Sequence, residues 1–123
     1  MPHFTAIATA IYPTADLAKA KAWYAQVFGA EPYFDQPFYV GFDIDGYELG
    51  LMPAEPPAHQ PGNRGVVAYW RVADCAAAHA RVLSLGARDL SPVQDVGEGI
   101  KVATVTDPDG NALGLIENPH FKK

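Results

Sequence analysis

The chain has very little cysteine and little positive charge. Its 123 residues include one cysteine, Cys75, so neither an internal disulfide nor a zinc site built from several thiolates is expected. Lysine and arginine number 9 against 14 aspartates and glutamates, which gives a net charge of −5, and no basic run is longer than Lys122-Lys123. Because nucleic-acid binding needs a concentrated basic face, we expect no nucleic-acid partner.

Long hydrophobic runs are also missing. The sequence has no stretch of about 18 apolar residues, so we expect no membrane-spanning segment and no membrane partner. Residues Met1 to Phe4 show no basic region followed by an apolar stretch, so no signal peptide is predicted and the expected location is the cytoplasm. The chain does have 11 glycines, 11 prolines and 49% hydrophobic residues, which indicates a packed single domain with many turns.

Hydrophobic spacing and turn residues predict the secondary structure. Thr14 or Asp16 caps the first helix, Gly29 ends it, and Asp74 caps the second. Asp45-Gly46 predicts a two-residue hairpin turn, while Pro13 is expected to end the first strand. The predicted strands are 4–11, 38–44, 47–52, 66–72, 100–106 and 112–116, and the predicted helices are 17–28 and 75–85.

The sequence contains an internal repeat. The segment D-I-D-G-Y-E-L-G-L-M begins at Asp43, and its counterpart D-P-D-G-N-A-L-G-L-I begins 64 residues later at Asp107. The strand, cap and helix around Asp16 recur 58 residues later around Asp74. The element order βαβββ therefore occurs twice. We predict an α+β fold in which paired βαβββ modules form a curved eight-stranded mixed sheet with helices outside and a cleft inside. The modules span about 1–53 and 66–121 of a single domain, 1–123, and a proline-rich loop at 54–65 joins them.

Two motifs carry a family resemblance. They are D-L-x-x-A-x-x-W-Y-x-x-V-F-G at Asp16–Gly29 and D-P-D-G-N-x-L-G-L-I-E-N-P at Asp107–Pro119. In both, the chain resembles the vicinal oxygen chelate superfamily, which contains glyoxalase I, extradiol dioxygenases, and fosfomycin- and bleomycin-resistance proteins. The resemblance covers nearly the whole chain and implies the fold, but the fold hosts several chemistries.

The resemblance also implies where a metal would bind. Metal-dependent members place His, Glu or Gln on the first and fourth strands of each module, and the matching positions here are Thr9, Gly50, Val67 and Gly114. None is a good ligand, because a divalent catalytic site needs about three imidazole or carboxylate donors. We therefore expect no metal and no cofactor, and we expect Gly50 and Gly114 to leave space that enlarges the cleft.

Strand alternation assigns further residues to the cleft wall. An Asp45-Gly46 hairpin pairs Asp43 with Glu48, and either this pair contributes to ligand binding or it is a solvated rim. Tyrosines on strands are also often core residues, and Arg71 is either a surface pair or a clamp for an anionic group. The ligand-binding candidates are Thr9, Tyr39, Asp43, Glu48, Gly50, Val67, Tyr69, Arg71 and Gly114.

Three functions fit these residues. The leading hypothesis is a metal-independent protein, similar to the antibiotic-binding resistance proteins, that binds a small organic molecule, cationic or aromatic, in its cleft. The second is a lyase, isomerase or dioxygenase-type enzyme with Glu48 as base and a tyrosine or Arg71 stabilising an oxyanion. The third is an interaction protein with a vestigial cleft. The resemblance further implies a homodimer.

Overall fold

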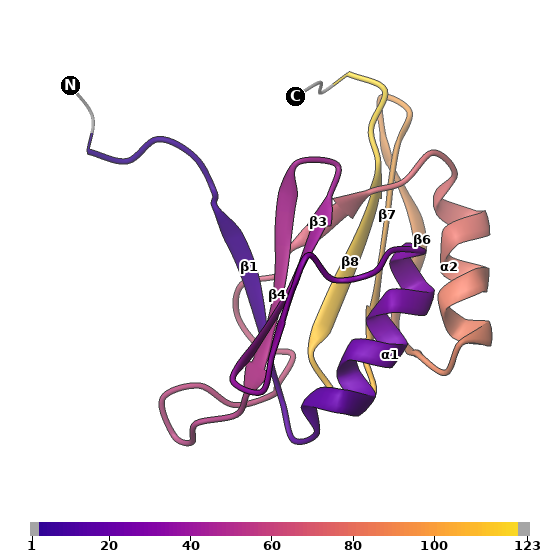
Figure 1. The fold of residues 1–123 in the computed structure, drawn as a ribbon. Helices are drawn as coiled ribbons and strands as arrows, with labels where there is room; N and C mark the ends of the chain where they lie inside the picture. Colours follow the sequence, from indigo (N-terminus) through magenta and orange to yellow (C-terminus); the bar gives the residue numbers. More distant parts are fainter. Residues whose placement is uncertain (1–2, 121–123) are drawn as a thin grey trace. The chain divides into compact units, whose positions relative to one another are not determined.

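The computed structural model describes residues 3–120 and divides between Gln60 and Pro61 into two compact units (Figure 1). Each unit has the predicted βαβββ order, which confirms the α+β fold, although the six strands predicted from hydrophobic spacing lack the second strand of each unit. The first contains β1 (Thr9–Thr14), α1 (Leu17–Phe28), β2 (Phe34–Gln36), β3 (Tyr39–Ile44) and β4 (Tyr47–Pro53). The second contains β5 (Tyr69–Arg71), α2 (Cys75–Ser84), β6 (Arg88–Gly97), β7 (Ile100–Thr106) and β8 (Ala112–Glu117).

The eight strands form two four-stranded mixed sheets. Their orders are β1-β4-β3-β2 and β5-β8-β7-β6, so the two sheets have equivalent topology. In each sheet the first strand of the unit runs parallel to the last, and the other pairs are antiparallel. A parallel neighbour requires a crossover, and the helix of each unit provides it.

Both helices begin at the predicted aspartates. The Asp16 carboxylate accepts a hydrogen bond from the Lys19 backbone N–H at 3.1 Å, and Asp74 accepts one from the Ala77 N–H at 3.0 Å. Gly29 ends α1 with a φ of 62°, a left-handed conformation that favours glycine. These contacts satisfy N–H groups that have no partner within the helix. Neither helix within residues 3–120 is long and apolar enough to cross a membrane.

The first strand differs from its prediction. Pro13 does not end it but lies inside β1, opposite Met52 of β4. A proline has no backbone N–H to donate, which would break the hydrogen-bond ladder in a central strand. An edge strand such as β1 tolerates it, because one side of the strand has no neighbour in the sheet. The strand therefore covers Thr9–Thr14, and the preceding residues lead away from the sheet as an arm (Figure 1).

The predicted hairpin between β3 and β4 is confirmed. Asp45 and Gly46 have φ values of 54° and 89°, as a turn with two left-handed residues requires. Asp43 Oδ1 accepts a hydrogen bond from the Gly46 N–H at 2.8 Å, which stabilises the turn. The resulting register pairs Asp43 with Glu48, also as predicted.

The second unit has a shorter first strand than the sequence predicts. Only Tyr69–Arg71 pairs with β8, and Val66 is fully exposed. The end of the proline-rich loop instead bonds to the turn before β8, where the Asn111 side-chain carbonyl accepts a hydrogen bond from the Gly62 N–H at 3.2 Å.

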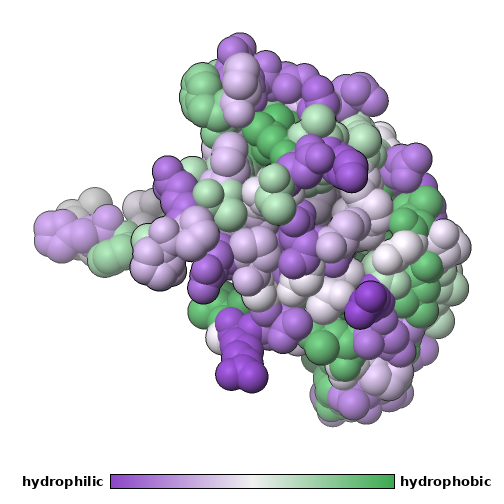
Figure 2. All heavy atoms as spheres, turned by 90° about the horizontal axis from the view of Figure 1, so that it is seen from below, coloured by the Kyte–Doolittle hydropathy of each residue, from purple (hydrophilic) through white to green (hydrophobic). Residues whose placement is uncertain are grey.

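One face of each sheet packs against the helix of its own unit, and that helix does not cover the other face. The buried apolar side chains of β3 and β4 lie at alternate positions, separated by a glycine or a polar residue, and Tyr24 of α1 is also buried. In the second unit Cys75 is fully buried, and this burial raises the pKa of its thiol, consistent with a core residue. Hydrophilic and hydrophobic residues are interspersed over the surface seen in Figure 2. The largest fully buried side chains are Tyr24, Val40, Phe42, Leu49, Leu51, Leu113 and Val105.

Candidate functional site

Predicted site residues gather on one face of the first sheet. Thr9 of β1 pairs with Glu48 of β4, which in turn pairs with Asp43 of β3. The alternate residues Phe42 and Leu49 are buried, so they occupy the opposite, helix-covered face. Alternation thus brings Thr9, Asp43 and Glu48 together on the face that α1 does not cover.

Glu48 is the centre of a hydrogen-bonded cluster on this face. The phenol of Tyr39 donates to Glu48 Oε1 at 2.7 Å, and the phenol of Tyr33 donates to Oε2. The Thr9 hydroxyl lies 3.5 Å from the Tyr39 hydroxyl. Both carboxylate oxygens therefore accept a hydrogen bond from a phenol. We call this group the carboxylate–phenol cluster; its members are Thr9, Tyr33, Tyr39 and Glu48.

These contacts favour the ionised form of Glu48. Desolvation raises the pKa of the Glu48 carboxyl, but hydrogen bonds from Thr9, Tyr33 and Tyr39 together outweigh it and leave the pKa below its ordinary value of 4.5. The hydrogen bond to Glu48, with a smaller contribution from desolvation, raises the pKa of Tyr33 to about 12. Burial and the contact with Glu48 also raise the pKa of Tyr39, against a lowering contribution from Thr9. At neutral pH the cluster therefore holds one carboxylate and two protonated phenols.

Tyr33 is the member of the carboxylate–phenol cluster that sequence reasoning missed. It precedes β2, a strand of only three residues, and its backbone N–H donates to the Gly41 carbonyl at 2.9 Å. A Cβ on Gly41 would lie 3.0 Å from the Tyr33 ring and 2.7 Å from Glu48 Oε2. The absence of a side chain at Gly41 is therefore what allows Tyr33 to reach Glu48. The sequence offered no signal for this contact, because β2 and its pairing with β3 were not predicted.

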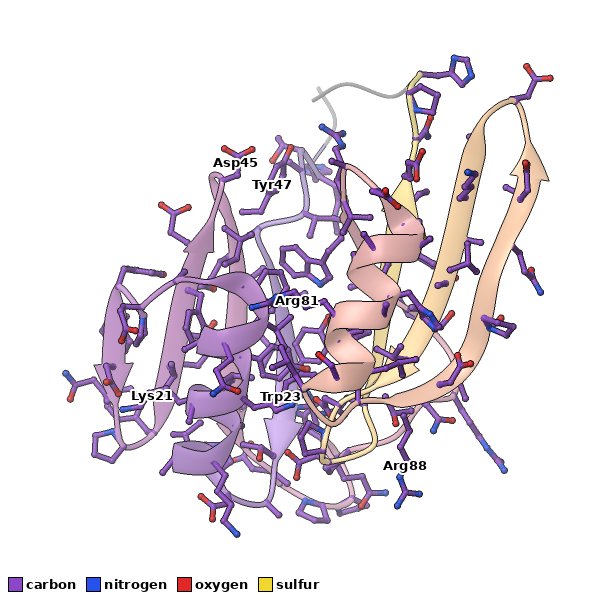
Figure 3. All side chains as sticks on the ribbon, turned by 90° about the vertical axis from the view of Figure 1, so that its right-hand side faces the viewer. Lys21, Trp23, Asp45, Tyr47, Arg81 and Arg88 are labelled. Atoms are coloured by element: carbon purple, nitrogen blue, oxygen red, sulfur yellow. The ribbon has the colours of Figure 1, made fainter. Side chains whose placement is uncertain are left out.

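A small hollow opens beside this cluster. Its volume is about 200 Å³. Asp43 and Glu48 place two carboxylates at the hollow, and Tyr33 is 63% exposed. Figure 3 shows Tyr47 and Asp45 at the tip of the hairpin between β3 and β4. The lining residues are Ala8, Tyr33, Asp43, Gly46, Tyr47 and Glu48.

Further aromatic rings continue from the cluster along β2 and β3. The Phe34 ring centroid lies 6.5 Å from that of Tyr33 and 6.2 Å from that of Tyr39. The ring centroid of Phe38 lies 6.1 Å from that of Phe34, and the Phe38 side chain is exposed. Exposed aromatic rings next to carboxylates offer both an apolar surface and a site for a cation.

The expectation that the two repeated glycines enlarge the cleft is wrong. A Cβ on Gly50 would overlap the Tyr39 hydroxyl and lie 2.7 Å from Cζ of that ring. In the second unit, a Cβ on Gly114 would lie 2.6 Å from Cδ2 of Tyr69, its partner in β5. Both glycines therefore lie beneath tyrosine rings that use the space a side chain would need.

The remaining candidates belong to the second unit. Tyr69, on β5, is 47% exposed, and Arg71, two residues later, is also exposed. Val67 lies just before β5 and is half-buried. Of the nine candidates, Thr9, Tyr39 and Glu48 form one contact cluster with Asp43 beside it, whereas Tyr69 and Gly114 form a contact of their own.

The residues at the four implied metal positions do not fit a divalent ion. Gly50, Val67 and Gly114 carry no side-chain donor, and Thr9 offers a neutral hydroxyl. Glu48, which pairs with Thr9, is a single carboxylate, fewer than the roughly three imidazole or carboxylate donors that such a site needs. Within residues 3–120, no group of three or more His, Cys, Asp or Glu side chains is arranged to hold a metal.

One comparison with known proteins identifies the family of this chain. The model of the Glyoxalase/Bleomycin resistance protein/Dioxygenase superfamily matches residues 2–115. No curated protein matches the chain.

Solved structures share the fold. A glyoxalase-related enzyme from Fulvimarina pelagi is 20% identical with a TM-score of 0.78, covering 94% of this chain and 90% of that one. A glyoxalase/bleomycin resistance protein from Catenulispora acidiphila is 24% identical with a TM-score of 0.68, covering 90% and 96%. The fosfomycin resistance protein FosX from Listeria monocytogenes is 19% identical with a TM-score of 0.72, covering 98% and 97%. At these identities the likeness extends to the fold alone.

The contact between Gly50 and Tyr39 makes a stability prediction. We expect Gly50→Ala to destabilise the protein by roughly 1–3 kcal/mol, because the added methyl group overlaps the Tyr39 phenol. In a Tyr39→Ala background the same substitution should have little effect. Urea unfolding of the two single variants and the double variant measures the difference.

Gly62→Ala is the matched control, because nothing lies within 4 Å of the added Cβ. An equal loss of stability from Gly50→Ala in both backgrounds would show that the backbone, and not the Tyr39 ring, requires glycine at this position.

Proposed function

The chain belongs to the Glyoxalase/Bleomycin resistance protein/Dioxygenase superfamily, and from that premise we propose that it binds a small organic molecule, cationic or aromatic, without a metal ion. The ligand occupies the face of the first sheet that carries the carboxylate–phenol cluster. The observation that carries this proposal is an ionised Glu48 held by two phenols beside an open hollow. Charge and aromatic surface are together what a cationic or aromatic ligand requires.

The size of the hollow limits what it can enclose. Sites that enclose a drug-sized ligand measure roughly 300–1,000 Å³. The hollow beside Glu48 measures about 200 Å³, so it accommodates one end of a molecule. The rest of the ligand then lies on the exposed rings of Phe34 and Phe38.

The enzyme hypothesis with Glu48 as base receives less support. An effective general base has a pKa near the working pH. The pKa of Glu48 is lowered below its ordinary value, which makes its carboxylate a weak base at neutral pH. The vestigial-cleft hypothesis receives support from Tyr39 and Tyr69, which fill the space above two glycines, but the hollow beside Glu48 stays open.

The proposal extends to assembly and location. We propose one domain made of modules 1–53 and 66–121 joined by residues 54–65, acting as a homodimer in the cytoplasm without nucleic acid. Phe4 and Ile7 on the arm before β1 are 93% and 81% exposed, and a partner copy would cover such apolar side chains.

Metal independence is directly measurable. After purification, exposure to Zn²⁺, Ni²⁺, Mn²⁺ and Fe²⁺, and removal of excess ions by gel filtration, we expect well under one metal ion per chain. The physical reason is the absence of side-chain donors at Gly50, Val67 and Gly114. Elemental analysis by mass spectrometry gives the ratio, and one retained ion per chain after mild chelation would contradict the proposal.

Ligand binding is tested by thermal unfolding with a panel of aromatic, cationic and neutral compounds. A compound present at 100 times its dissociation constant stabilises a protein by about 2.7 kcal/mol. We expect at least one aromatic or cationic compound to raise the melting temperature of the native chain, and Glu48→Gln to reduce that shift. Glu98→Gln is the matched control, because it removes an exposed carboxylate on the second unit. A panel without any shift would contradict ligand binding.

A further inference from the structure

Resting on the proposed function, we propose that the hollow beside Glu48 selects a primary ammonium group attached to an aromatic or apolar body. The argument follows the protons and lone pairs of the lining side chains. Each phenol has one proton to donate, and Tyr33 and Tyr39 both donate theirs to Glu48. Of the two tyrosines, Tyr33 borders the hollow, so its phenol oxygen meets a ligand there as a hydrogen-bond acceptor.

Asp43 adds a second acceptor on the same side. Its Oδ1 accepts the Gly46 N–H at 2.8 Å, while Oδ2 makes no hydrogen bond among residues 3–120. Asp43 lies directly opposite Glu48 in the hairpin, so the two carboxylates border the same hollow. The lining residues include no lysine, arginine or histidine to neutralise them.

This set of groups discriminates among ligand ends. A carboxylate or phosphate on the ligand would be repelled by the two like charges of Asp43 and Glu48. A neutral carbonyl would lack a hydrogen-bond donor, because the Tyr33 hydroxyl already donates its hydrogen bond to Glu48. A primary ammonium brings one positive charge and three N–H donors, which matches two carboxylates and a phenol oxygen. A quaternary ammonium brings the charge without the donors.

The aromatic rings determine what the ammonium is attached to. Tyr33 borders the hollow, and the centroid of the Phe34 ring lies 6.5 Å from that of the Tyr33 ring. Phe34 and Phe38 are both exposed. An aromatic ring one or two bonds from the nitrogen can stack on these side chains while the nitrogen reaches the carboxylates.

Four probes separate charge, donors and aromatic surface: benzylammonium, benzyltrimethylammonium, benzyl alcohol and benzoate. Chemical-shift titration of the ¹⁵N-labelled chain measures each dissociation constant. We expect benzylammonium to bind roughly tenfold more tightly than benzyl alcohol and benzyltrimethylammonium, because it alone combines charge with three donors. We expect no saturable shifts near Gly46 and Tyr47 with benzoate.

Two variants locate the effect. Glu48→Gln should weaken benzylammonium binding about tenfold and leave benzyl alcohol nearly unchanged. Asp43→Asn removes a charge but keeps the side-chain oxygen that accepts the Gly46 N–H, so it should weaken benzylammonium binding while the hairpin remains folded. Glu98→Gln should leave all four constants unchanged.

The outcomes distinguish this inference from the proposed function. Equal binding of benzylammonium and benzyl alcohol would overturn the ammonium selectivity while leaving an aromatic-binding protein. Equal binding of benzylammonium and benzyltrimethylammonium would overturn the requirement for N–H donors. Dissociation constants weaker than about 10 mM for every probe would overturn both the selectivity and binding at this hollow.

Discussion

The phenols of Tyr33 and Tyr39 both donate hydrogen bonds to the Glu48 carboxylate. The arrangement of the first sheet's face that α1 does not cover depends on this contact. The bonds from Tyr33 and Tyr39 hold Glu48 in place, bring the segment before β2 against β3, and determine which protons remain for a ligand. They also outweigh the desolvation that would otherwise raise the pKa of Glu48. The negative charge of the hollow therefore follows from a hydrogen-bonding arrangement that is built into the sheet.

Glycine makes this arrangement possible. Gly41 leaves room for the Tyr33 ring and the Glu48 carboxylate, and Gly50 leaves room for Tyr39. At Gly50 the missing side chain is what admits the tyrosine ring. Gly114 and Tyr69 make an equivalent contact in the second unit.

Local rules predicted much of the fold and part of the site. The Asp45-Gly46 turn has a fixed length, so the pairing of Asp43 with Glu48 followed from the sequence. Alternation then placed Thr9 and Tyr39 on the face of Glu48. The position of Tyr33 could not be predicted in this way, because it depends on a close approach across β3.

Other errors had the same origin in tertiary contacts. Pro13 lies inside β1 because that strand is at the sheet edge, and edge position is a property of the assembled sheet. Whether a glycine leaves a cavity or accommodates a neighbouring ring likewise depends on the residue that faces it, as Tyr39 faces Gly50. Sequence spacing identifies the glycine but not its neighbour.

The most direct test of the account is the pKa of the Glu48 carboxyl, followed by ¹³C NMR and assigned with Glu48→Gln. The account predicts a pKa below the ordinary value of 4.5, which moves upward in Tyr33→Phe. Because the folded pKa is the lower one, the stability that Glu48 contributes is present above the unfolded pKa and is lost as pH falls through the folded pKa. A Glu48 pKa at or above 4.5 in the native chain would contradict the carboxylate–phenol cluster as the source of the site's charge.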